Sequence, residues 1–179
     1  MYPSQNLFVQ GVLRLLMVKA IEMIRFGFII AFFIIILDQI SKYFVMDYLS
    51  GGFMTITSFF NLVYVFNTGI SFSLLSNNTS WAPLIFSLVG CIFVLLLIYW
   101  LYKAENRVLA SGLGLIIGGA LGNIIDRLVH GAVFDFLDFH LLDYHFPAFN
   151  VADLSISLGV FIVIFDNIFI QGSKKNVSR

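Results

Sequence analysis

Charged residues are scarce in this sequence. Only 11% of its 179 residues are Asp, Glu, Lys or Arg, whereas a soluble domain usually carries about 25%. The chain is 60% hydrophobic and 17% aromatic, so it lacks the polar residues needed to cover a surface in water. A lipid bilayer is therefore its expected solvent. Ten basic and ten acidic residues balance to zero net charge, and nothing favours nucleic-acid binding.

Cysteine and the common catalytic signatures are also nearly absent. The single cysteine, Cys91, excludes an internal disulfide or a cysteine-based metal cluster, and its apolar neighbours indicate packing. The three histidines lie outside the apolar stretches, so we expect no metal and no cofactor. There is no Gly-x-Ser-x-Gly motif, and the adjacent Ser41 and Lys42 would point about 100° apart on a helix. Carboxylates and asparagines remain, which favours acid–base chemistry on water.

Four apolar stretches are present, each long enough to cross roughly 30 Å of hydrocarbon as about 20 helical residues. The sequence therefore predicts an all-α membrane protein, a single domain over residues 1–179. Its four transmembrane helices are expected at about residues 25–45, 81–102, 108–128 and 150–170. The third and fourth are weaker by hydropathy because they contain polar residues.

The first 23 residues precede the first expected span. They contain Arg14, Lys19 and Glu22 among apolar residues at mixed spacing. The adjoining apolar run is too long for a signal peptide, and no small-residue cleavage site follows it. We favour an amphipathic helix at the membrane interface that leads into the first span. Disorder and an upstream start codon are the alternatives.

The basic residues are distributed unevenly around the expected spans. No Lys or Arg occurs in residues 49–80, and none in residues 128–150. The positive-inside rule therefore predicts that both termini and the short loop between spans two and three are cytoplasmic, and that the two long loops face outward. The basic residues on the predicted cytoplasmic side are Arg14, Lys19, Arg25, Lys103, Arg107, Lys174, Lys175 and Arg179.

The outer loops differ in composition from the spans. Residues 53–66 are rich in β-branched and aromatic side chains, and the segment is punctuated most clearly at Asn67-Thr68-Gly69. This pattern predicts a short strand pair with a turn. Residues 132–139 are a further candidate extended segment. We therefore expect a small extracytoplasmic β element beside the helices.

Polar residues of three spans are expected at one depth, near the outer end of the bundle. Charges inside a membrane usually face the bundle interior, a partner or water. Alternatively, each residue could simply lie at a helix end or extend its side chain toward the membrane surface. That interpretation explains a single polar residue better than a set of residues at one depth. The set comprises Asp38 and Lys42, which are spaced to pair on one helix face, together with Asn123, Asp126, Arg127, Asn150, Asp153 and Ser157.

Glycine recurs every four residues in the third span, at Gly114, Gly118 and Gly122, and Asp126 continues this ridge. Small residues at this spacing let helix backbones approach closely. The ridge would thus present the polar end of the third span to its neighbours. Asp166, near the inner end of the fourth span, is interpreted as an interfacial or capping residue.

Two aspartates could activate water by sharing a proton, because like charges a few ångströms apart do not both ionise easily. Asp153 is one candidate. Asp135 is another, since burial in the apolar run 133–136 would favour its protonated form. For Asp126, the adjacent Arg127 indicates a structural ion pair. The residues alone do not choose Asp135 over the other candidates, Asp126, Asp138 and Asp143.

Five motifs in the chain, taken in order, resemble those of the type II (lipoprotein) signal peptidases of bacteria. The family patterns are Asp-x-x-Ser/Thr-Lys, Asn-x-Gly-Ala-Ala-Phe, Gly-Gly-x-x-Gly-Asn-x-x-Asp-Arg, Val-Val-Asp-Phe and Phe-Asn-x-Ala-Asp. The matching segments are Asp38-Gln39-Ile40-Ser41-Lys42, Asn67-Thr68-Gly69-Ile70-Ser71-Phe72, Gly118-Gly119-Ala120-Leu121-Gly122-Asn123-Ile124-Ile125-Asp126-Arg127, Val133-Phe134-Asp135-Phe136 and Phe149-Asn150-Val151-Ala152-Asp153.

The resemblance implies an aspartic intramembrane peptidase whose catalytic dyad is Asp135 and Asp153. Ile70 stands where the family pattern has a small Ala, at the expected mouth of the site. The residues that would orient, support or bind are Asn67, Gly69, Asn123, Asp126, Arg127, Asn150, Asp38 and Lys42.

The resemblance also implies the substrate and the location. The substrate would be a prolipoprotein whose lipobox cysteine carries diacylglycerol, cut just before that cysteine. The enzyme would lie in the bacterial cytoplasmic (inner) membrane with its active site facing outward, in contact with membrane lipids. Globomycin-type antibiotics are expected ligands on this resemblance alone.

Two other classes of function compete with a peptidase. A proton-coupled transporter could use the buried carboxylates as a relay, but it would need polar groups through the full membrane depth. The inner halves of the first two expected spans are almost purely apolar, which disfavours such a path. A structural assembly factor is the third class, and it would tolerate Asp→Asn changes.

Overall fold

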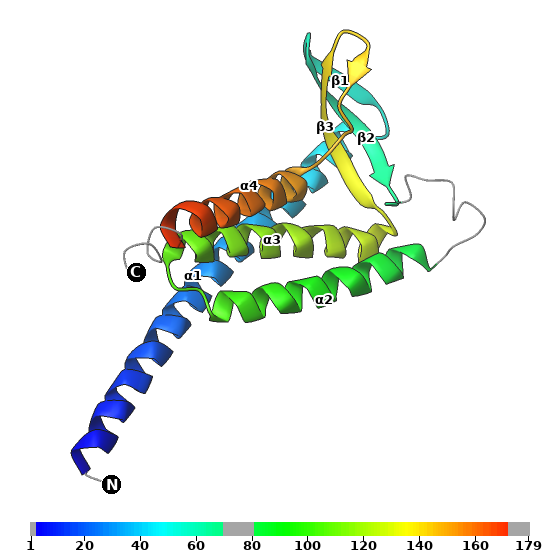
Figure 1. Ribbon diagram of the computed structural model, residues 1–179. Helices are drawn as coiled ribbons and strands as arrows, with labels where there is room; N and C mark the ends of the chain where they lie inside the picture. Colours follow the sequence, from blue (N-terminus) through cyan, green and yellow to red (C-terminus); the bar gives the residue numbers. More distant parts are fainter. Residues whose placement is uncertain (1–2, 70–80, 172–179) are drawn as a thin grey trace.

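Four helices are long and apolar enough to cross a membrane in the part of the chain that the computed structural model describes, residues 3–69 and 81–171. A small antiparallel sheet lies at one end of the bundle (Figure 1). These features confirm the predicted fold class. The helices are α1 (Pro3–Leu49), α2 (Ala82–Tyr102), α3 (Arg107–His130) and α4 (Val151–Phe165), and a π-helical turn, η2 (Asp166–Gln171), continues α4.

Some features of the sequence fall outside the described residues. Ile70, with its motif neighbours Ser71 and Phe72, is one of them. The basic residues Lys174, Lys175 and Arg179, which contributed to the predicted topology, are the others.

Helix α1 is much longer than the predicted first span. It has 47 residues, which correspond to about 70 Å at 1.5 Å per residue, roughly twice the thickness of the hydrocarbon layer. The N-terminal extension continues the same helix without a break, and the side chains of residues 9–19 are all exposed. Figure 1 shows this part of α1 extending beyond the other helices.

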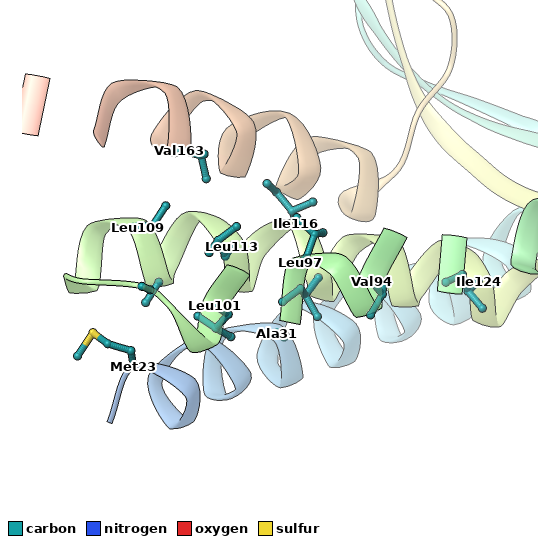
Figure 2. Packing of buried hydrophobic residues seen from close by; sticks show 13 residues of the cluster. Met23, Ala31, Val94, Leu97, Leu101, Leu109, Leu113, Ile116, Ile124 and Val163 are labelled. Carbon is teal, nitrogen blue, oxygen red and sulfur yellow. The ribbon is translucent and has the colours of Figure 1, made fainter. Parts of the chain in front are cut away.

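Helix α3 occupies the middle of the bundle and contacts α1, α2 and α4. Its apolar side chains, among them Leu113 and Ile117, meet Leu101 of α2 and Val163 of α4 in the buried cluster of Figure 2. α3 is also the most buried of the four helices, whereas the highly apolar α2 is mostly exposed. This distribution suits lipid as solvent, because the apolar helices cover the outside and the helix with polar residues is enclosed.

Glycines allow α3 to approach two neighbours at once. A Cβ atom placed on Gly118 would lie 2.8 Å from the carbonyl oxygen of Ala31 in α1. A Cβ on Gly119 would clash with the carbonyl oxygen of Ala152 in α4. The predicted glycine ridge therefore packs on α1, and a second ridge, which the sequence analysis missed, packs on α4.

The sheet contains β1 (Phe53–Thr57), β2 (Phe60–Asn67), β3 (Val133–Leu141) and β4 (Tyr144–His145), ordered β1-β2-β3-β4 with antiparallel neighbours. Both predicted extended segments are thus strands. The hairpin turn lies at residues 58–59, whereas Asn67-Thr68-Gly69 follows the end of β2. Gly131, at φ +75°, ends α3 in the left-handed conformation and directs the chain into β3.

The return from the sheet to α4 runs alongside β3. The Phe149 carbonyl accepts hydrogen bonds from the backbone N–H groups of Phe136, at 3.1 Å, and Leu137, at 2.9 Å, and the Phe149 N–H donates to the Leu137 carbonyl. The next residue, Asn150, is the N-cap of α4. The first turn of α4 is therefore held against the start of β3.

Candidate active site

Asp135 and Asp153 come together where β3 meets the first turn of α4. Asp135 is the third residue of β3, paired across the sheet with Val65 of β2. Asp153 is the third residue of α4 and is partly exposed. The two carboxylates are close enough to interact electrostatically. Of the carboxylates that the sequence analysis left open, Asp135 is thus the one beside Asp153.

Two asparagines connect these aspartates. Asn150 Nδ2 donates to Asp135 Oδ1 at 2.7 Å, and Asn123 Nδ2 of α3 donates to Asp153 Oδ1 at 2.8 Å. Asn150 Nδ2 also lies 3.3 Å from Asn123 Oδ1, which closes the chain of hydrogen bonds. Both carboxylates therefore have fixed orientations before any substrate is present.

The second oxygen of Asp135 accepts a hydrogen bond from Asn67 Nδ2 at 3.0 Å. Asn67 is held in turn by the N–H of Gly69, which donates to its Oδ1 at 2.8 Å. Gly69 has φ +78°, a conformation that glycine adopts without strain. The two predicted residues of this motif thus position one amide group on Asp135.

Asp135 is 2% exposed, and its pKa is raised to about 6. Burial is the main cause, because it disfavours the charged form. The hydrogen bond from Asn67 opposes the rise, the negative charge of Asp153 adds to it, and the hydrogen bond from Asn150 opposes it. Asp135 therefore keeps a proton to higher pH than an exposed aspartate does.

Asp153 has a different environment, because it belongs to a capping box. Its backbone N–H donates to Asn150 Oδ1 at 2.9 Å, and its Oδ2 accepts from the Asn150 backbone N–H at 3.3 Å. The first turn of a helix stabilises negative charge through its free N–H groups and dipole. The two aspartates thus differ in environment, because Asp135 is buried whereas Asp153 is partly exposed at the start of a helix.

A second polar cluster lies directly behind the pair, around Lys42 of α1. Its ammonium group is 2.8 Å from Asp38 and 2.8 Å from Asp126, and it donates to Asn123 Oδ1 at 3.3 Å. Lys42 is 3% exposed and Asp38 is fully buried. The three donors of the ammonium group are all used, so the buried charge is compensated.

This cluster ties all of the site's elements together. Asp38 Oδ1 accepts from the backbone N–H of Ala152 in α4 at 2.9 Å. Asp126 Oδ2 accepts from the backbone N–H of Phe134 in β3 at 3.0 Å. The predicted pairing of Asp38 with Lys42 is confirmed. The predicted pairing of Asp126 with Arg127 is wrong in the described part of the chain, because Asp126 pairs with Lys42.

Arg127 is one residue further along the helix, so it faces a different direction from Asp126. It donates to the Asn123 carbonyl at 3.3 Å, and its guanidinium lies 5.9 Å from the ring centre of Phe86. Its charge interacts first with Asp153 and then with Asp126 and Asp135. Arg127 therefore provides a positive charge near both aspartates without a direct ion pair to either, within the residues described.

The sequence analysis missed Gln39. Its amide donates to Asp126 Oδ1 at 3.0 Å and lies within hydrogen-bond distance of Asp38 Oδ2 at 3.1 Å and the Gly122 carbonyl at 3.3 Å. A glutamine in an apolar span was the available signal, because polar residues inside a membrane usually face partners. Ser157, predicted in the polar set, is exposed and bonds only the Asp153 carbonyl of its own helix among the described residues.

The remaining acidic candidates lie elsewhere. Asp138, further along β3, accepts from Asn61 Nδ2 at 3.0 Å and contacts His145 Nδ1 at 2.9 Å. Although burial pushes the pKa of Asp138 upward, these two partners outweigh it and lower the pKa. Asp143 is exposed in the turn between β3 and β4. At the opposite end of the bundle Asp166 is the C-cap of α4, as predicted, and accepts from Asn106 at 2.8 Å.

Comparison with known proteins places these residues in context. A family model described as signal peptidase (SPase) II matches residues 30–169. A lipoprotein signal peptidase of Burkholderia vietnamiensis is 43% identical over 141 residues, covering 78% of this chain and 85% of the relative. A lipoprotein signal peptidase of Francisella tularensis subsp. mediasiatica is 45% identical over 146 residues, covering 79% of this chain and 91% of the relative.

A solved structure has the same fold. It is that of a bacterial membrane enzyme determined by the in meso method at 1.9 Å resolution, and it superposes with a TM-score of 0.70 at 31% sequence identity. The match covers 80% of this chain and 92% of that one. The matched family region contains all the residues from Asp38 to Asp153 described above.

Proposed function

Because the chain belongs to the signal peptidase II family, we propose that it removes signal peptides from prolipoproteins by aspartic catalysis with Asp135 and Asp153. The observation that supports this most is the linked pair itself. Asn150 holds Asp135 at 2.7 Å and Asn123 holds Asp153 at 2.8 Å, and the two asparagines contact each other. Such an arrangement suits two carboxylates that share one proton.

The environments of the two aspartates support different roles. Asp153, in the first turn of α4, is the base that takes a proton from the attacking water. Asp135, whose pKa is raised to about 6 by burial, is the acid that donates a hydrogen bond to the scissile carbonyl and later a proton to the leaving amine.

The supporting residues would act through this pair. Lys42, Asp38 and Asp126 fix α1, α3 and β3 relative to α4 by the contacts described above. Arg127 adds a positive charge that acts on both aspartates. In surroundings of low dielectric constant, fixed charges and donors of this kind stabilise developing negative charge more than they do in bulk water.

We place the site at the outer surface of the bacterial cytoplasmic membrane, with both termini in the cytoplasm. The lack of Lys and Arg in residues 49–80 and 128–150 supports this orientation. The site would then lie where both water and an inserted signal helix can reach it, and where the lipid chains of a diacylglyceryl cysteine can rest among the helices. Cleavage would fall just before that cysteine, and globomycin-type inhibitors would compete at this position.

A proton relay across the membrane is disfavoured by the middle of the bundle. Two buried polar groups lie at opposite ends of α3, around Asp126 and around Asn106 with Asp166. Among the described residues, the core between them is formed by apolar side chains such as Leu113 and Ile117. A continuous path of polar groups is therefore absent from the described core.

The test is cleavage of a purified, diacylglyceryl-modified precursor by the purified enzyme. Asp135→Asn and Asp153→Asn should each reduce product formation by at least about a thousandfold, because neither can take its part in proton transfer. Asp143→Asn, which changes an exposed aspartate in the β3–β4 turn, is the matched control and should retain full activity. Full activity in either dyad variant would overturn the assignment.

A further inference from the structure

We propose that an anionic phospholipid binds in a groove at the end of the bundle opposite the sheet, between α1 and the start of α3. The groove has a volume of about 410 Å³ and is lined by six residues of α1 and by Arg107 of α3. It lies far from the two aspartates, so this binding site is additional to the proposed catalytic function and does not depend on it.

The charges of the groove suit a phosphate diester. Arg25 and Arg107 supply two guanidinium groups against one carboxylate, that of Glu22. Guanidinium groups bind phosphate oxygens in pairs and are less strongly hydrated than ammonium groups. Within the described residues Arg25 has no hydrogen bond or ion pair, so its donors are available to a ligand. Lys19, one turn before Glu22 on α1, adds a further positive charge nearby.

The existing ion pair does not block the groove. Arg107 Nη2 lies 2.6 Å from Glu22 Oε1, but the two side chains are 68% and 51% exposed. An exposed pair of this kind contributes little, because water and salt compete for both partners. A phosphate group can therefore bind the Arg107 guanidinium either beside the Glu22 carboxylate or in its place. The ring of Phe26, 5.7 Å from the guanidinium carbon, holds that group in place.

The remaining wall of the groove is apolar and open. Ile21 is 52% exposed and Ile29 is 53% exposed, and both line the groove. An acyl chain that extends from a bound headgroup would cover such side chains. A free phosphate ion would leave them exposed, so the combination of guanidinium groups and apolar wall favours a lipid.

Two helices independently place this groove at the level of lipid headgroups. Arg25 precedes Lys42 by 17 positions on α1, and Arg107 precedes Asp126 by 19 positions on α3. At 1.5 Å per residue these separations are about 26 and 28 Å, close to the thickness of the hydrocarbon layer. With the polar cluster at one membrane surface, the groove lies at the other, where basic pockets between helices bind anionic headgroups.

The test measures lipid affinity of the full-length protein in a mild detergent, with dioleoylphosphatidylglycerol and dioleoylphosphatidylcholine as probes. The anionic lipid should bind more tightly, and Arg25→Gln and Arg107→Gln should each weaken it about fivefold, the effect of one basic residue near a headgroup. Lys103→Gln is the matched control, because Lys103 lies over the ring of Tyr99 and outside the groove. This control should bind as the wild type does.

Removal of the negative charge in the groove gives an independent test of the proposal. Glu22→Gln removes the one carboxylate among the described residues that line the groove and should tighten binding of the anionic lipid. Glu105→Gln, in the adjacent loop, should leave binding unchanged. Arg25→Gln changes an exposed side chain, so it should leave the melting temperature unchanged and report on binding alone.

Several results would overturn the proposal. Equal affinity for both lipids, or unchanged affinity in Arg25→Gln, would show that the guanidinium groups do not bind a headgroup. Inorganic phosphate that binds as tightly as the lipid would show that the apolar wall contributes nothing. A dimer that buries the groove and excludes lipid would assign it to a second copy of the chain. None of these results bears on cleavage by Asp135 and Asp153, so the two proposals fail separately.

Discussion

Asp135 combines deep burial with three polar neighbours, and its protonation should therefore be visible in the stability of the protein. Its pKa is raised from 3.8 to about 6 in the folded state. Because the folded state binds this proton more tightly than the unfolded state does, the resulting stabilisation is complete below pH 3.8 and is lost as pH rises through about 6. Two pKa units correspond to at most about 3 kcal/mol.

We expect Asp135→Asn to lack this pH dependence. Compared with the variant, the wild type should lose up to about 3 kcal/mol of unfolding free energy between pH 4 and pH 7.5. Thermal or denaturant unfolding in detergent at several pH values measures the difference. Asp143→Asn serves as the control, because that residue is exposed, and its curve should parallel the wild type. Parallel curves for Asp135→Asn would contradict the assigned titration.

The ion pairs around Lys42 include one that the sequence predicted and one that it did not. Asp38 and Lys42 were predicted to pair because their spacing on a helix is local information. The partner of Asp126 was predicted wrongly, since adjacency to Arg127 in the chain says little about neighbours across a bundle. Lys42, on another helix, lies 2.8 Å from Asp126, and a local sequence pattern cannot predict a contact between residues so far apart in the chain.

Among the elements, the first turn of α4 has two tasks. Asn150 caps the helix through Oδ1, which accepts from the Asp153 N–H at 2.9 Å, and its Nδ2 donates to Asp135 at 2.7 Å. The cap stabilises the helix, while the amide orients an aspartate of the neighbouring strand. The sequence Asn-x-x-Asp before an apolar run is a recognisable helix-start signal, although the sequence analysis did not use it to place the start of this helix.

Replacing Asn150 should separate these tasks. Asn150→Ser keeps a good N-cap but is too short to reach Asp135, so peptidase activity should fall at least tenfold while the melting temperature changes little. Asn150→Ala removes the cap as well and should lower stability further, by about 1 kcal/mol. Activity assays and thermal unfolding of both variants measure the two effects. Wild-type activity in Asn150→Ser would show that the amide does not orient Asp135.

For the glycines of α3, the sequence predicted one close contact with a neighbouring helix but not a second. The spacing of Gly114, Gly118 and Gly122 predicted one close contact surface. The structure has two, because Gly119 faces the carbonyl of Ala152 in α4 while Gly118 faces Ala31 in α1. Adjacent positions on a helix lie about 100° apart, so a Gly-Gly pair can serve two neighbours.

At the scale of the whole molecule, the proposed orientation can be tested by cysteine labelling in intact cells. Cys91→Ala removes the only cysteine, and Thr57→Cys or Glu105→Cys then places one at either end of the bundle. A membrane-impermeant maleimide should label Thr57→Cys in intact cells or spheroplasts and Glu105→Cys only after the membrane is opened. The reverse pattern would invert the topology, and activity of the Cys91→Ala background confirms its fold.

The long helix α1 was the main surprise of the architecture. Residues before position 25 were expected to form an interfacial amphipathic helix that leads into the first span, and the chain forms one unbroken helix from Pro3 to Leu49. Between residues 12 and 49 the chain has no proline and a single glycine, Gly27, so the local sequence gives the helix little reason to bend. The other spans, α2 and α3, begin and end within two residues of their predicted bounds.

The sequence by itself determined the solvent, the number of spans, the strands and the shared depth of the polar residues. Hydropathy, residue periodicity and charge asymmetry are all local properties, so they can be read along the chain. The tertiary structure decided which carboxylate lies beside Asp153, which cation serves Asp126, and how β3 is held against α4 by Phe149. These depend on contacts between residues far apart in the chain, and such contacts exist only once the helices have packed.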